Sequence, residues 1–193
     1  YILHRVIYKG KGIFMVKDMT EGKPGRLILE FAIPLLMGNL FQQFYSLVDT
    51  AIVGKFLGVD QLAAVGSTGS INFLIIGFCM GICSGFAIPI AQRFGAKDES
   101  GMRRCVANSA WVSVIFAVVL TIVTVLLCRN ILQWMRTPEN IIDDAWMYIV
   151  IIFAGIPVTI LYNLTSAIIR AMGDSKTPVY FLVMSALLNI VLD

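Results

Sequence analysis

The stretch from Leu27 to Gly54 has the length and composition of a membrane-spanning helix, yet it carries a carboxylate, Asp49, deep inside it. No Lys or Arg lies between Arg26 and Lys55 to neutralise that charge. An ionised acid near the centre of a bilayer costs roughly 2.5–3.5 kcal/mol on insertion scales. We therefore expect Asp49 to face water or a partner, or to be protonated.

Further apolar stretches follow the first one. Hydrophobic residues make up 58% of the sequence and charged residues only 14%, whereas soluble domains have about 25% charged residues. A run of about 20 apolar residues is long enough to cross a bilayer as a helix. The sequence predicts an all-α, polytopic transmembrane helix bundle with spans at residues 27–54, 62–91, 105–128, 145–169 and 178–193.

The basic residues of the short loops predict the orientation. Nine Lys and Arg side chains lie in the leader and in the linkers after the second and fourth spans, and three lie in the other linkers. Because Lys and Arg accumulate in cytoplasmic loops, the N-terminus is expected to be cytoplasmic. The net charge of +3 is small and lies in loops, so no nucleic-acid partner is expected.

The two ends of the chain differ from the spans. Residues 1–14 are unlike the rest and are interpreted as an upstream or non-native extension, with Met15 or Met19 as the expected start and residues 15–26 as a cytosolic leader. The fifth span stops at Asp193, before it is long enough to cross a bilayer. The sequence is therefore expected to be part of a longer protein.

A polar face runs along the first span. Asn39, Gln42, Ser46 and Asp49 are spaced by three, four and three residues, which places them on one side of a helix. A polar face on a membrane helix is expected to point into a bundle or cavity and away from lipid. The alternative is a structural Asp49 whose charge is satisfied by neighbouring hydroxyls and amides.

A second acid closes the visible part of the fifth span. Asn189 and Asp193 are four residues apart and lie on one face of a helix. No Lys or Arg lies within the spans, so the expected counter-ion of these acids is a proton, Na⁺ or a cationic substrate. Asp and Asn oxygens suit Na⁺ better than zinc or copper. The sequence thus predicts an H⁺ or Na⁺ site at Asp49, Asn189 and Asp193, although channels, pumps and receptors also bury acids.

Enzyme motifs are missing from the sequence. It contains no P-loop, no GxSxG and no HExxH motif, and its single histidine is His4. We therefore expect a protein that is not an enzyme, that has no organic cofactor and that is not driven directly by ATP.

Four segments resemble the multidrug and toxic compound extrusion (MATE) family, in the family's order and spacing. They are IPLLMGNLFQQFYSLVDTAIVGKFLGVDQLAAVG, PIAQRFGAKD, IIRAMGDSKTP and LLNIVLD. The family has twelve helices in two lobes, so the resemblance implies about five of the twelve helices, all from the N-terminal lobe. It also implies that Asp49, Asn189, Asp193 and, with them, Asn163 line a cavity that binds H⁺ or Na⁺; Gln42 is added from the polar face.

The resemblance implies a function for the full-length parent. It would be a monomeric antiporter in a bacterial cytoplasmic membrane, exchanging H⁺ or Na⁺ for organic cations, drugs or toxic compounds. One alternative is a lipid-linked precursor flippase of the same superfamily, which would favour buried Arg or Lys that the spans lack. The others are an ion channel and an inert truncated fragment.

Overall fold

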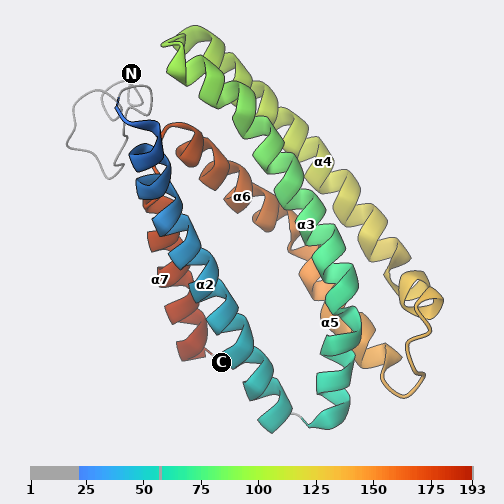
Figure 1. The fold of residues 1–193 in the computed structure, drawn as a ribbon. Coiled ribbons are helices and arrows are strands. Elements are labelled where there is room, and N and C mark those ends of the chain that lie inside the picture. The colour runs from blue at the N-terminus through green and yellow to red at the C-terminus, as the bar shows by residue number, and fades with distance from the viewer. Residues whose placement is uncertain (1–21, 57, 193) are drawn as a thin grey trace. The chain divides into compact units, whose positions relative to one another are not determined.

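A computed structural model describes residues 22–56 and 58–192, apart from the side chains of Asp49 and of residues 189–192. The predicted extension at residues 1–14, most of the predicted leader and Asp193 lie outside this part of the chain. The described residues form helices and no strands, which confirms the predicted all-α class (Figure 1). The helices are α2 (Pro24–Phe56), α3 (Val59–Gly95), α4 (Glu99–Trp134), α5 (Ile142–Ala154), α6 (Ile156–Ala171) and α7 (Thr177–Leu192).

Three of the described helices, α2, α3 and α4, are long and apolar enough to cross a membrane. The pair α5 and α6 passes the same test as one span with a bend of 44°, and α7 has a shorter apolar stretch over Thr177–Leu188. With 37 and 36 residues, α3 and α4 are each about 55 Å long, and a bilayer core is about 30 Å thick. Their ends therefore extend beyond the hydrocarbon.

The surface of α4 shows the inverted polarity of a helix in lipid. Its exposed side includes Ile115, Ile122 and Leu126, whereas Ser113 and Thr124 are each 3% exposed. The Thr124 hydroxyl donates to the carbonyl of Leu120, 2.8 Å away. Apolar side chains outside and small hydroxyls inside suit a helix bundle surrounded by lipid, where helix contacts favour small and polar residues.

The break between α5 and α6 lies at Gly155, two residues before Pro157. Proline has no N–H, so Pro157 cannot donate to the carbonyl four residues earlier, and its ring disfavours a continuous helix. The N–H of Gly155 closes α5 by donating to the carbonyls of Ile151 and Ile152. By contrast, α2 and α3 continue through Pro34 and Pro89 as single helices.

The helices group into two compact units. Unit 1 contains residues Tyr1–Leu47, Phe86–Val106 and Thr165–Asp193, and unit 2 contains Val48–Gly85 and Ala107–Leu164. In unit 2, the Cys83 thiol donates to the carbonyl of Ile160 across 3.8 Å. The rings of Phe78 and Phe116 meet edge to face with centroids 5.7 Å apart.

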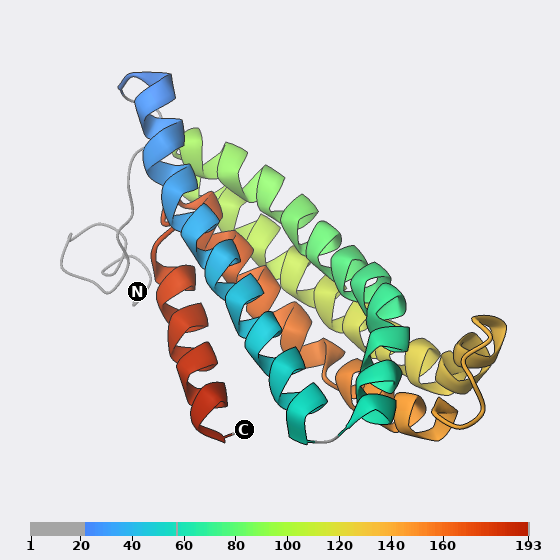
Figure 2. The same cartoon turned by 60° about the horizontal axis from the view of Figure 1, so that its bottom comes forward.

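In unit 1, α7 lies beside the first part of α2 and runs in the same direction (Figures 1 and 2). Gly38 marks a close approach of the two helices, because a Cβ atom at this position would lie 3.1 Å from Cγ2 of Val179 and 3.7 Å from Cδ2 of Leu182. The absence of a side chain at Gly38 lets the two helices pack this closely.

Two turns of unit 1 share one backbone pattern. In the α3–α4 turn, the N–H of Lys97 donates to Phe94 and the N–H of Asp98 donates to Arg93, both at 3.0 Å. In the α6–α7 turn, the N–H groups of Gly173 and Asp174 donate in the same way to Arg170 and Ile169. These bonds form a Schellman motif, which requires a left-handed residue after the helix; Lys97 has φ 56° and Gly173 has φ 88°.

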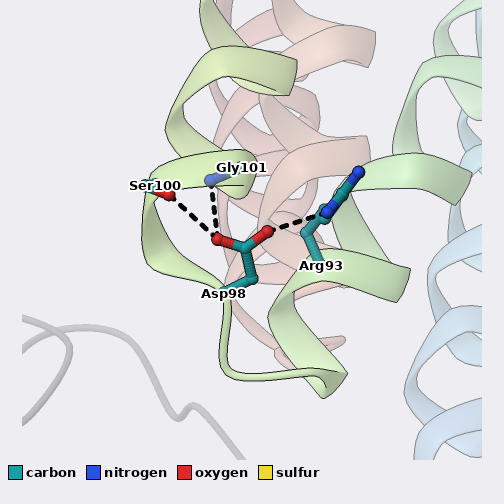
Figure 3. Close-up of polar contacts among 4 residues, drawn as sticks. All are labelled: Arg93, Asp98, Ser100 and Gly101. Carbon is teal, nitrogen blue, oxygen red and sulfur yellow. Dashed lines mark hydrogen bonds and ion pairs between the residues drawn. The ribbon is translucent and has the colours of Figure 1, made fainter.

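An aspartate follows the left-handed residue in both turns and caps the next helix. Asp98 Oδ1 accepts from the N–H of Gly101 at 2.9 Å and from the Ser100 hydroxyl at 3.0 Å, and Oδ2 accepts from Arg93 at 2.8 Å (Figure 3). Through these bonds, with the Gly101 N–H contributing most, the pKa of Asp98 is held below its ordinary value of 3.8.

Asp174 makes the corresponding cap at α7. Its Oδ1 accepts from the N–H groups of Lys176 and Thr177, both at 3.0 Å, and its Oδ2 accepts from the Thr177 hydroxyl. Asp174 is 1% exposed, so this cap is buried.

Candidate functional site

The polar face of the first span lies on a single helix. Because α2 runs unbroken from Pro24 to Phe56, the spacing of Asn39, Gln42, Ser46 and Asp49 places their Cα atoms on one side of it. The side chains of Asn39, Gln42 and Ser46 are exposed. Exposed apolar side chains such as Leu40 and Phe44 lie on the same helix, so the orientation of this polar face away from lipid stays a prediction. The side chain of Asp49 lies outside the described part.

Asn189 lies near the end of α7, ten residues beyond Val179. The contact of Val179 with Gly38 fixes how α7 meets the first part of α2. The side chain of Asn189 and all of Asp193 fall outside the described part. Their expected i, i+4 pairing therefore remains a prediction.

Asn163 is buried in α6 with 8% of its surface exposed. Its Nδ2 donates to the carbonyl of Thr159 at 2.8 Å, and the Thr159 hydroxyl donates to the carbonyl of Gly155 at 3.2 Å. These bonds form a ladder along one face of α6 that begins at the break after α5. A buried amide is costly unless it is hydrogen-bonded, and the ladder satisfies one of its two N–H groups.

Thr159 was not among the residues expected from the sequence to belong to the site. The spacing of the sequence could have identified it, because Gly155, Thr159 and Asn163 follow one another at intervals of four residues. A hydroxyl or amide four residues after a carbonyl can bond back along the same helix. Thr159 thereby orients the amide of Asn163.

The five expected site residues are described to different degrees. Gln42 is exposed in unit 1 and Asn163 is buried in unit 2. Of Asp49 and Asn189 only the backbones are described, in α2 and α7, and Asp193 lies outside the described part. Among the side chains that the structure describes, no three His, Cys, Asp or Glu residues gather as a metal site. What the described residues contribute is an exposed amide on α2 and a positioned, buried amide on α6.

Comparisons with known proteins agree with this helical arrangement. The MatE family model matches residues 34–193. The probable multidrug resistance protein YoeA of Bacillus subtilis is 40% identical over 162 residues, which cover 84% of this chain and 35% of that protein.

Solved structures match the fold as well. The structure described as MATE in the straight conformation has a TM-score of 0.82 at 30% identity and covers 91% of this chain and 39% of its own. The structure described as MATE in the bent conformation has a TM-score of 0.81 at 30% identity, with coverages of 89% and 38%.

The chain spans little more than a third of the length of these relatives. The relative named above is a bacterial multidrug resistance protein, which supports neither an enzyme nor the flippase alternative. The family model covers most of the sequence and the helices superpose on solved members over nearly all of it. The chain therefore belongs to the MatE family of multi-pass membrane transporters.

Proposed function

We propose that the gene product containing this chain exports organic cations, drugs or toxic compounds in exchange for H⁺ or Na⁺. The observation that carries the proposal is Asp49, an acid without a neighbouring base in the apolar helix α2 of a chain similar to a multidrug resistance protein. An ionisable side chain within a membrane span is by default a functional-site hypothesis, and the expected partner of an acid is a cation.

The proposed ion site consists of Asp49, Asn189 and Asp193, with Asn163 and Gln42 as further polar groups of the cavity. Support comes from the number of residues that separate the site residues from the contact between α2 and α7. Asp49 lies eleven residues after Gly38, and Asn189 lies ten residues after Val179. Carboxylate and amide oxygens are hard ligands, which suit Na⁺ and can also exchange a proton.

The proposed mechanism is alternating access. In the outward-facing state the ion binds the carboxylates, and this neutralises the charge that holds the cationic substrate. The substrate then leaves outward, and the ion gradient resets the cycle. The ion can drive this change only through a difference in its affinity for the two states, and the substrate is coupled by the same rule.

A bend of α2 at Pro34 and Gly38 is proposed as part of this change. Pro34 removes one helix hydrogen bond, so α2 is weakest in the turn before it. Related structures are described as straight and bent conformations of a MATE protein, which supports a transporter with two shapes. A Pro34→Ala protein that transports at the normal rate would show that the bend is dispensable.

The setting of the proposed transporter follows from the same reasoning. It would be a monomer in a bacterial cytoplasmic membrane with a cytoplasmic N-terminus, and it would use no organic cofactor. The excess of Lys and Arg in the leader and in the α3–α4 and α6–α7 turns supports this orientation.

The test is efflux of a fluorescent cationic dye from an efflux-deficient bacterium that expresses the intact gene product. Asp49→Asn keeps the size of the side chain and removes its charge. Asp60→Asn is the matched control, because Asp60 is exposed in the first turn of α3. We expect Asp49→Asn to reduce efflux to the level of cells without the transporter and Asp60→Asn to leave efflux unchanged.

The coupling ion is identified by imposing a pH gradient or a Na⁺ gradient on membrane vesicles that contain the transporter. The gradient that drives dye transport names the ion. Normal efflux by Asp49→Asn at equal expression would make Asp49 a structural residue and would refute the proposed site.

A further inference from the structure

One end of unit 1 holds the start of α2, the α3–α4 turn and the α6–α7 turn (Figures 1 and 2). Among the described residues of this end, Lys and Arg outnumber Asp and Glu. The described acids near this end are already engaged. Glu30 pairs with Arg26 at 2.8 Å and Glu99 lies 4.0 Å from Arg103. Asp98 is occupied by Arg93 and the cap of α4.

The remaining acid among the described residues of this end is also unavailable to a surface cation. Asp174 is 1% exposed, and its oxygens accept from the first turn of α7. The two turns thus use their aspartates as helix caps. The lysines next to them, Lys97 and Lys176, stay exposed at the surface.

Four exposed cations of this end have no acidic partner within the described residues: Lys23, Lys97, Arg104 and Lys176. The turn geometry fixes two of them, because Lys97 is the left-handed residue of one Schellman motif and Lys176 donates its N–H to the cap Asp174. Their backbone positions are therefore set before any ligand arrives.

Large exposed apolar side chains follow two of these cations along the chain. Tyr180 and Phe181, 64% and 58% exposed, follow Lys176 by four and five residues. Ile28, 64% exposed, follows Lys23 by five residues. At about 1.5 Å per residue, Lys176 and Lys23 each lie roughly 6–8 Å from an exposed apolar group, which is comparable to the distance between a phospholipid phosphate and the start of its acyl chains.

We propose that this end of unit 1 binds the headgroups of anionic phospholipids, with the phosphates on Lys97, Arg104, Lys176 and Lys23 and the acyl chains against the apolar side chains beyond them. Lysine and arginine reach the headgroup level while their stems lie on apolar surface. A soluble phosphate would use the charges but not the apolar groups, so the arrangement favours a lipid. This binding requires neither the proposed substrate nor the coupling ion.

The test measures how strongly the protein prefers an anionic lipid. The intact gene product is reconstituted in bilayers of phosphatidylcholine and phosphatidylglycerol, and spin-labelled lipids report the relative association constant of the two. The test variant combines Lys97→Gln with Arg104→Gln. The matched control combines Lys55→Gln, in the last turn of α2, with Arg136→Gln, after α4, which removes the same charge from unit 2.

We expect the wild type to prefer phosphatidylglycerol and the test variant to lose about threefold or more of that preference. The control should keep it, and 1 M salt should weaken it in the wild type because the Debye length falls to about 3 Å. An equal preference in all three proteins, or an equal loss in the control, would overturn the proposal. Displacement of the lipid by millimolar glycerol phosphate would overturn it too, since the surface would then bind phosphate alone.

Discussion

The α3–α4 turn and the α6–α7 turn have the same backbone but hold their aspartates in different surroundings. Each ends one helix with a Schellman motif and begins the next with an aspartate cap. Asp98 has 33% of its side chain exposed and is also bound by an arginine and a serine. Asp174 is buried and accepts hydrogen bonds from the turn that it caps.

The comparison shows that the surroundings, more than the motif, set how much each cap contributes. Water can replace a lost bond at Asp98, because the site is at the surface. Asp174 and Thr177 are 1% and 4% exposed, so a lost bond leaves the buried N–H of Thr177 unpaired, which costs more than the bond itself contributes. The two turns therefore form a pair of sites with one geometry and two environments.

The largest difference is expected when the aspartates are removed. Asp174→Ala should destabilise the first turn of α7 by about 2 kcal/mol, at the upper end for a helix cap, and Asp98→Ala should destabilise α4 less. The amides of Lys176 and Thr177 would then exchange more than tenfold faster, as measured by hydrogen–deuterium exchange and mass spectrometry. Asp174→Asn is the control, because an asparagine oxygen still caps the helix. Equal effects of the two alanine variants would show that burial is unimportant here.

A smaller difference is expected at the left-handed residues. Gly173→Ala places a Cβ at φ 88°, which should cost about 1 kcal/mol. Lys97→Ala should be nearly neutral, because Lys97 already carries a Cβ at φ 56°. Thermal unfolding of the purified protein would report both. A loss at Lys97→Ala as large as that at Gly173→Ala would mean that the lysine side chain itself stabilises the turn.

Much of this fold could be predicted from the sequence. Each described helix overlaps a hydrophobic run of the sequence. The run at 145–169, however, was expected as one span and forms two helices, α5 and α6, which separate at Gly155. The polar linkers were expected as turns, but their caps were not, although an aspartate just before Glu-Ser-Gly or Ser-Lys-Thr is a recognisable helix start. The burial of Asp174 depends on packing between segments far apart in the chain, and a local sequence pattern does not encode such packing.

The candidate site was predictable in part for a similar reason. An acid in an apolar run identifies Asp49 from the sequence alone. Asn163 was expected from the family resemblance, but its hydrogen bond to the Thr159 carbonyl depends on where α6 begins after the break. The residue at which α6 begins after the break decides which backbone carbonyls its polar side chains can reach.

Gly101 provides a sharper test of the α3–α4 cap. A Cβ at this position would collide with Oδ2 of Asp98 and lie 2.9 Å from its Cγ. Gly101→Ala should therefore displace the carboxylate and weaken the cap by a small amount, since the site is exposed. The same substitution in an Asp98→Ala background should have no further effect. Additive losses in exchange protection at the start of α4 would show that Gly101 acts through something other than the cap.

The weakest expected effect depends on pH. Because the N–H of Gly101, the Ser100 hydroxyl and Arg93 hold the pKa of Asp98 below 3.8, the carboxylate stabilises the folded turn fully above the unfolded pKa. This contribution is lost as the pH falls through the lower folded value. Amide protection at Gly101 should thus be constant from pH 7 to about pH 5 and should fall below about pH 4. Asp98→Asn, which cannot titrate, should lack that fall once the shared acid response of other carboxylates is subtracted. If the wild type and Asp98→Asn gave the same profile, the charge of Asp98 would contribute nothing to the α3–α4 turn. The two turns would then differ because only Asp174 caps its helix effectively, and not only because Asp174 is buried.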